Sequence, residues 1–328
     1  MVAVSNWAKP RLNRDVIRGP GDLAMSMVQP KVPSAQVALV TPSYDRDFQS
    51  CKLLCETIDT YATGHCGHFI LIDPSDAALF SALAGPNRFI VTDEDLLPRG
   101  ALIPLGLRWR GRKYWAAGFK MPVNGWHVQQ IRKIAVAASL DIDQVVVIDS
   151  DTYLCREVDF SDRNRDAVPL YADPGAVREN RPNHIRWFQS AHALLGYEAP
   201  PIPADDFIGH VITWDTASVR SMIARIETVN GRPWWDALCA IRHFSEYMIY
   251  GVTVLNDAAL AARHEPTSQS VCQSYWDAEQ LDEAAITSML ASLTPDQYSI
   301  AIQSFSPTSR DLIRSVIMAP RLVPGVSL

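Results

Sequence analysis

The chain has 328 residues, of which 48% are hydrophobic and 20% charged, and its formal net charge at pH 7 is -6. This length allows one large α/β domain or two smaller ones, and the acidic balance argues against a general nucleic-acid-binding protein. No apolar run reaches the roughly 18 residues that cross a bilayer, and the N-terminus lacks the charged and apolar segments of a signal peptide, so we expect a cytoplasmic protein.

Residues 1–34 contain four prolines and no sustained hydrophobic period. This pattern indicates an irregular N-terminal arm, which either wraps the domain or supports a homo-oligomer. Strands and helices then alternate, which is typical of a mostly parallel sheet. The expected elements are strands at Gln36–Thr41, His68–Ile72 and Arg88–Val91, and helices at Phe48–Tyr61 and Ser75–Leu83.

Cysteines within the first predicted helix follow a helical period. Cys51, Leu54, Cys55 and Ile58 are spaced as one buried helix face, so we expect buried, reduced thiols. A zinc site that also uses Cys66 is the alternative, but the spacing does not match the common C-x2-C patterns.

The segment Pro98–Pro122 interrupts the alternation and is rich in Gly, Arg and aromatic residues. It is either a mobile loop beside an anionic ligand or a solvated loop. The later pattern predicts an irregular stretch from Tyr153 to Pro203. It also predicts the helix Trp126–Leu140, the strand Val145–Ile148, the strand Phe207–Trp214, and the helix Thr216–Val229 with Asp215 as its N-cap.

The strand Val145–Ile148 is followed directly by Asp149-Ser150-Asp151. Alternate residues of an extended chain point the same way, so both carboxylates can reach one spot at the strand's C-terminal end, where open α/β sheets bind ligands. Oxygen ligands suit Mg²⁺ or Mn²⁺, which also binds phosphate oxygens. The pattern therefore predicts a metal–diphosphate site, and an Asp-rich turn without function is the alternative.

A second group of polar residues lies on a predicted helix near residue 246. His243, Glu246 and Tyr250 share one face of this helix. A carboxylate on a rigid helix can act as a general base, because its position is fixed and its pKa can be tuned. A solvent-facing or ion-paired Glu246 is the alternative interpretation.

Together these segments resemble the GT-A fold glycosyltransferases and, more narrowly, a bacterial family of uncharacterised, glycosyltransferase-like proteins of the DUF6492 type. The resemblance covers roughly residues 35–280. It implies a single GT-A-like (Rossmann-like) domain with a mostly parallel central sheet, flanking helices, and the DxD at a strand C-terminus. Residues 281–328 would then form a C-terminal helical extension and tail. The segments that carry the resemblance are Thr41–Asp45, Gly125–Gln130, Val147–Asp151, His243–Tyr247 and Ser274–Trp276.

The resemblance also implies an activity and its residues. The expected reaction moves a sugar from a nucleoside diphosphate, UDP favoured, to a hydroxyl of a glycan, a lipid-linked or a small-metabolite acceptor. Glu246 would be the base of an inverting enzyme, with His243 beside it. Mn²⁺ or Mg²⁺ would be bound by Asp149, Asp151 and His264. The residues expected to hold the nucleotide are Thr41, Ser43, Asp45, Asp73, Lys133 (or its neighbour Arg132) and Asp149.

Two other functions fit parts of the pattern. A non-catalytic nucleotide-sugar-binding protein would keep the pocket without turnover. A haloacid-dehalogenase-type phosphatase would use Asp149 as its nucleophile, although Tyr153 stands where that motif has Thr or Val.

Overall fold

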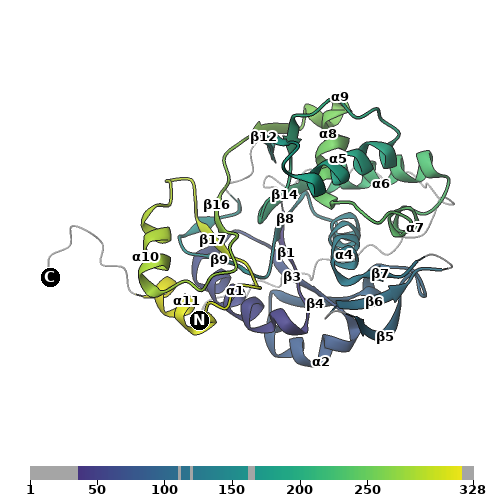
Figure 1. The fold of residues 1–328 in the computed structure, drawn as a ribbon. Helices are drawn as coiled ribbons and strands as arrows, with labels where there is room; N and C mark the ends of the chain where they lie inside the picture. Colours follow the sequence, from purple (N-terminus) through teal and green to yellow (C-terminus); the bar gives the residue numbers. More distant parts are fainter. Residues whose placement is uncertain (1–35, 110–111, 119–120, 162–166, 320–328) are drawn as a thin grey trace, which may run out of the picture.

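A computed structural model describes residues 36–319, except 110–111, 119–120 and 162–166. The predicted arm at 1–34 and the end of the tail lie outside the described residues. The fold is a mixed α/β architecture in which helices flank a central, mostly parallel sheet (Figure 1).

The central sheet has five strands in the order β14-β8-β1-β3-β4. Four are parallel, and β14 runs antiparallel to β8. The chain moves outward from β1 through β3 to β4 and then returns to the other side of β1 with β8. The strand order therefore reverses between β1 and β8, and this switch point is where open α/β sheets bind ligands. The strands are β1 (Val37–Pro42), β3 (Gly67–Ile72), β4 (Arg88–Thr92), β8 (Gln144–Ile148) and β14 (Val211–Asp215).

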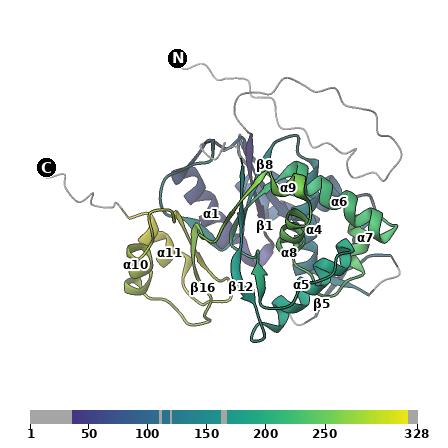
Figure 2. The same ribbon diagram turned by 90° about the horizontal axis from the view of Figure 1, so that it is seen from above.

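Both faces of this sheet are buried, and alternate residues pack into different cores. Val40 and Val147 belong to the cluster with helices α4 to α8, whereas Leu39 and Val146 pack with α1 and the C-terminal elements. Figure 2 shows these two layers on opposite sides of the sheet. The first layer contains α4 (Gly125–Ser139), α5 (Pro182–Leu195), α6 (Thr216–Asn230), α7 (Trp234–Cys239), α8 (Glu246–Leu255) and α9 (Ala258–Ala261).

The second layer combines α1 with the end of the chain. Strand β17 lies between β16 and β9, so the predicted boundary at residue 280 falls between two paired strands. Residues 281–317 are therefore packed into the same fold. The elements are α1 (Phe48–Tyr61), β9 (Thr152–Leu154), β16 (Cys272–Tyr275), α10 (Glu283–Ala291), β17 (Ser299–Ile302) and α11 (Arg310–Ile317).

Several predicted elements are confirmed, including α1, α6 with its Asp215 cap, and the buried cysteine face of α1. The strand predicted at Phe207–Trp214 begins only at Val211, and the helix predicted at Ser75–Leu83 is a four-residue α-helix between two 3-10 turns.

Two longer segments also differ from the prediction. The Pro98–Pro122 segment, which was expected to be a loop, contains β5 (Ile103–Trp109) and β6 (Arg112–Ala116), and these form an antiparallel sheet with the following β7 (Val123–Asn124). The stretch expected to be irregular contains α5, because Pro182 opens that helix.

The remaining elements are short. In the described part of the chain, no helix is both long and apolar enough to cross a lipid bilayer. The short elements are β2 (Ala62–Thr63), α2 (Ala77–Phe80), α3 (Asp93–Leu96), β10 (Val158–Asp159), β11 (Val168–Tyr171), β12 (Asp173–Val177), β13 (Ala204–Asp206), β15 (His264–Thr267) and the 3-10 turns η2 (Asp45–Asp47), η3 (Pro74–Asp76) and η4 (Ser81–Leu83).

Helix α8 approaches Phe207 closely at Gly251, and this contact predicts the cost of adding one methyl group. A Cβ at Gly251 would lie 2.2 Å from Phe207 Cγ. We expect Gly251→Ala to destabilise the protein by about 1–3 kcal/mol through overpacking, measured by urea unfolding. Gly125→Ala is the control, because its Cβ would lie an ordinary 3.5 Å from Trp115. Equal stability of the two variants would contradict the close approach.

Candidate functional site

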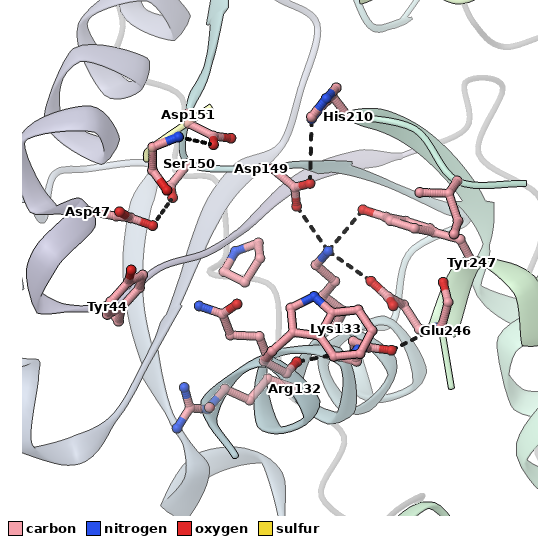
Figure 3. Close-up of a pocket in the computed structure, with 18 of the residues that line it drawn as sticks. Tyr44, Asp47, Arg132, Lys133, Asp149, Ser150, Asp151, His210, Glu246 and Tyr247 are labelled. Atoms are coloured by element: carbon pink, nitrogen blue, oxygen red, sulfur yellow. Dashed lines mark hydrogen bonds and ion pairs between the residues drawn. The ribbon is translucent and has the colours of Figure 1, made fainter. Parts of the chain in front are cut away.

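A cavity of about 460 Å³ opens at the switch point of the central sheet. Its walls come from the helices α4, α5 and α8, from the strands β5 and β6, and from the segments that follow β1, β3, β8, β16 and β17 or precede β14. The side chains on which the site is built are Tyr44, Asp47, Asp73, Arg132, Lys133, Asp149, Ser150, Asp151, His210, Glu246, Tyr247, Trp276 and Ser304. Figure 3 labels ten of these and shows the carboxylate of Asp149 directed at the amine of Lys133.

The two carboxylates of the DxD lie on a tight turn. Strand β8 ends at Ile148, and the amide of Thr152 donates a hydrogen bond to the carbonyl of Asp149 at 3.0 Å. The prediction that Asp149 and Asp151 lie on an extended chain is therefore wrong. The backbone forms the Asp-rich turn of the alternative interpretation. Both Asp149 and Asp151 nevertheless line the cavity.

A third carboxylate, that of Asp47 at the N-terminal end of α1, lies beside this turn. Ser150 Oγ lies 3.5 Å from Asp47 Oδ2, and the amide of Ser304 donates to Asp151 Oδ2 at 2.9 Å. Burial raises the pKa of Asp151 to about 6, and the nearby charges of Asp149 and Asp47 add to the effect. Burial likewise raises the pKa of Asp47 to about 6. These carboxylates thus form an acidic cluster with too little compensating charge.

Lys133 lies beside this cluster and is itself almost fully buried. Its Nζ donates to Asp149 Oδ1 at 2.9 Å, to Glu246 Oε1 at 2.8 Å and to the Tyr247 hydroxyl at 2.9 Å. Burial works against the charge of Lys133, but Asp149 and Glu246 outweigh it and hold the lysine pKa well above its ordinary value. The site therefore contains a fixed cation within reach of one DxD carboxylate (Figure 3).

The carboxylates of this cluster suit the expected Mg²⁺ or Mn²⁺ only in part. Within the described ranges, no three His, Cys, Asp or Glu side chains are arranged to hold a metal ion. Mg²⁺ is usually bound through one or two carboxylates together with substrate phosphates. The raised pKa of Asp151 indicates a carboxylate whose charge a cation would relieve. The residues therefore fit a cation shared with a diphosphate, and they do not fit one held by protein side chains alone.

Of the other residues expected to hold the nucleotide, Asp73 lines the cavity, whereas Thr41, Ser43 and Asp45 do not. Asp73 lines the cavity, where its carboxylate lies 3.7 Å from Arg132 and 3.8 Å from Lys113. Thr41 and Ser43 are fully buried, and Thr41 pairs with His68 instead of facing the cavity. Asp45 pairs with Arg108, whose side chain does line the cavity.

Two expected histidines are not brought to the carboxylates. His264 uses Nε2 with the Tyr250 hydroxyl and Nδ1 with the carbonyl of Leu260, at 2.7 and 2.8 Å. Both ring nitrogens are engaged away from the cavity, so the proposed ligand role of His264 is not supported. His243 is exposed and is not part of the cavity wall, although Glu246 on the following helix is.

Three residues of the site escaped the sequence reasoning. Asp47 had a local signal, because it follows the first strand two residues after Asp45. His210 precedes β14, and its Nδ1 lies 3.8 Å from Asp149 Oδ2 only because β14 pairs antiparallel with β8. Ser304 reaches Asp151 because β17 pairs with β9. The last two depend on strand pairing, which has no local sequence signal.

The sequence profile of a family of unknown function, DUF6492, matches residues 34–319. This range includes the central sheet, the cavity and the C-terminal strands and helices. No curated protein matches the chain.

Proposed function

The chain belongs to the DUF6492 family, whose function is unknown, and we propose from its site that it is a cation-dependent glycosyltransferase of the GT-A type. Its donor would be a nucleoside diphosphate sugar, with UDP favoured, and its acceptor a hydroxyl group. The observation that carries this proposal is the pairing of an acidic turn, Asp149 to Asp151, with the buried cation of Lys133 in one cavity.

The position of the site supports the proposal. The acidic turn follows β8 and Asp47 follows β1, so both flank the switch point of the sheet. Asp73 follows β3 on the same edge and offers a buried carboxylate beside Arg132. Carboxylates at this edge suit ribose hydroxyls and cations, while lysine and arginine suit phosphate oxygens.

The residues have distinct tasks in the proposed reaction. A divalent cation bound by Asp149 and Asp151 together with the diphosphate would stabilise the charge that develops on the leaving group. The three N–H donors of Lys133 are engaged by Asp149, Glu246 and Tyr247, so Lys133 would act on the same phosphates through its fixed positive charge, which needs little reorganisation. Glu246 and Tyr247 hold Lys133 in place. Glu246 is 2% exposed and already paired with Lys133, so its base role is not part of the proposal.

A thermal-shift panel tests this proposal. A ligand that binds the native state at 100 times its dissociation constant stabilises it by about 2.7 kcal/mol. We expect UDP or GDP with Mn²⁺ to raise the melting temperature, and the matching nucleoside or the same nucleotide with a chelator to do so far less. Nucleotide-sugar turnover, measured as released nucleoside diphosphate, then identifies the donor.

Other outcomes would point elsewhere. Binding without turnover across a broad acceptor panel would favour a nucleotide-sugar-binding protein. Phosphate release from simple phosphomonoesters, with Asp149 required, would favour a phosphatase. If the nucleotide raised the melting temperature equally with and without Mn²⁺, the proposed cation dependence would be wrong.

A further inference from the structure

Two tryptophans from different helices form an aromatic wall of the cavity. Trp126 at the start of α4 and Trp187 on α5 have ring centroids 5.4 Å apart with their planes at 35°. Both line the cavity, and Trp126 is 41% exposed. Flat, partly exposed aromatic side chains in a cavity with polar groups are typical of ligand sites. Such a surface suits the C–H face of a sugar ring, whose hydroxyls lie at the edges.

A histidine held by a buried carboxylate stands beside this wall. The His184 ring packs on Trp187 with centroids 4.9 Å apart, and His184 Nδ1 is hydrogen-bonded to Asp206 Oδ2. The Asp206 side chain is 3% exposed, and its other oxygen accepts from the amide of Ile208 at 3.0 Å. Because a carboxylate accepts, Nδ1 must donate, which leaves Nε2 to take a proton. His184 lines the cavity.

This arrangement supplies a base that Glu246 does not. The Glu246 carboxylate is engaged with Lys133, and protonating it would break a buried ion pair. His184 has a fixed orientation and a neighbouring platform for a substrate. A general base needs a fixed orientation and a bound substrate beside it.

We propose that Trp126, Trp187 and His184 form the acceptor subsite, that the acceptor is a sugar ring, and that His184, oriented by Asp206, is its base. This inference rests on the proposed function. His184 Nε2 takes the proton of the acceptor hydroxyl while that oxygen bonds to the anomeric carbon of the donor. The bond from this carbon to the phosphate oxygen breaks, and the nucleoside diphosphate leaves with the electron pair.

The experiment has a binding arm and a turnover arm. Methyl glycosides and disaccharides are titrated against the nucleotide-free protein by tryptophan fluorescence. The same sugars are then offered as acceptors with Mn²⁺ and the donor found by thermal shift. We expect His184→Gln to lower acceptor-dependent kcat about 100-fold or more with little change in acceptor KM. We expect Trp126→Ala to raise acceptor KM about 3- to 10-fold, with Trp126→Phe restoring part of it.

Folded variants and a matched control keep these results interpretable. UDP with Mn²⁺ should raise the melting temperature of His184→Gln as much as that of the wild type. Asp206→Asn is the second variant, and it should lower kcat less than His184→Gln because it only orients the ring. His65→Gln is the matched control, since His65 lies before β3 and is not part of the cavity wall. It should leave turnover unchanged.

The outcomes separate this inference from the proposed function. If the turnover of His184→Gln stayed within threefold of the wild-type value, His184 would not be the base. The absence of any sugar that binds or accepts would overturn the subsite. If no nucleotide binds, the proposed function fails and the base role with it. The fluorescence titration of the wild type and Trp126→Ala would then still decide whether the aromatic wall binds sugars.

Discussion

Asp151→Asn should abolish cation-dependent nucleotide binding and, at the same time, stabilise the free protein. The carboxylate is buried beside Asp47 and Asp149, so its charge is costly until a cation arrives. Mutating a residue that only supports a metal ligand lowers metal affinity roughly 10- to 100-fold. Because Asp151 is proposed as a direct ligand, its replacement should weaken UDP binding with Mn²⁺ by more than this. Calorimetry with Mn²⁺ measures this loss, and the exposed Asp296→Asn serves as the control. Affinity like that of the wild type would contradict the site.

The stability gain should depend on pH with a defined sign. Against its ordinary value of 3.8, a folded-state pKa of about 6 for Asp151 corresponds to roughly 3 kcal/mol of ionisation cost at neutral pH, part of which is shared with Asp47 and Asp149. The folded state holds this proton more tightly than the unfolded chain does, so wild-type stability falls as pH rises between 3.8 and 6. Above pH 6 we expect Asp151→Asn to raise the free energy of unfolding by about 1–2 kcal/mol. The melting temperature should rise with it, by roughly 2–4 °C for each kcal/mol. Below pH 3.8 the gain should vanish.

Lys133→Met should destabilise the protein strongly. Lys133 is the shared partner of Asp149, Glu246 and the Tyr247 hydroxyl, and its loss leaves the buried Glu246 carboxylate without its cation. Breaking a buried ion pair from one side costs about 3–5 kcal/mol. Urea unfolding measures the loss, and Lys52→Met, on the exposed face of α1, is the matched control.

A double-mutant cycle assigns the cause of this loss. Because Glu246→Gln removes the stranded charge, the double variant Lys133→Met with Glu246→Gln should regain a large part of the stability. Additive losses would show that Glu246 is not the main partner of the lysine. A Lys133→Met variant within 1 kcal/mol of the wild type would contradict the buried ion pair altogether.

Elements with a strong local period were predictable from the sequence. Helix α1 has the expected bounds because its cysteine face repeats at helical spacing, and α6 begins where Asp215 caps it. Helix α5 was missed although Phe188, Ala191, His192 and Leu195 follow the same spacing and are buried. Pro182 stands at the start of this helix, where proline is favoured in the first turn.

The antiparallel sheet β5-β6-β7 was missed for a different reason. Its strands contain Gly106 at positive φ and a shifted register between Pro104 and Arg108, which blur the alternation that identifies a strand. Composition alone pointed to a loop. The tertiary pairing that holds these strands has no local signature.

The cavity contains predicted residues of two kinds: those that follow parallel strands, and Lys133 and Glu246 on two helices, which the family resemblance indicated. Asp73, Asp149 and Asp151 were identified by their place after a strand, and the cavity includes all three. The partners of Lys133 come from α8 and from the turn after β8, which are separated by about a hundred residues, and sequence alone does not pair them. The same limit applies to His184 and Asp206, which α5 and β13 bring together.

The insertion of β17 between β16 and β9 has a consequence for biosynthesis. Until residues 299–304 leave the ribosome, the edges of both neighbouring strands have no partner and the Asp151 carboxylate lacks the amide of Ser304. A nascent chain that stops short of these residues therefore cannot complete its ligand cavity, and it exposes two strand edges of the kind that promote aggregation. We therefore expect the cavity to be complete only after residues 299–304 have been synthesised.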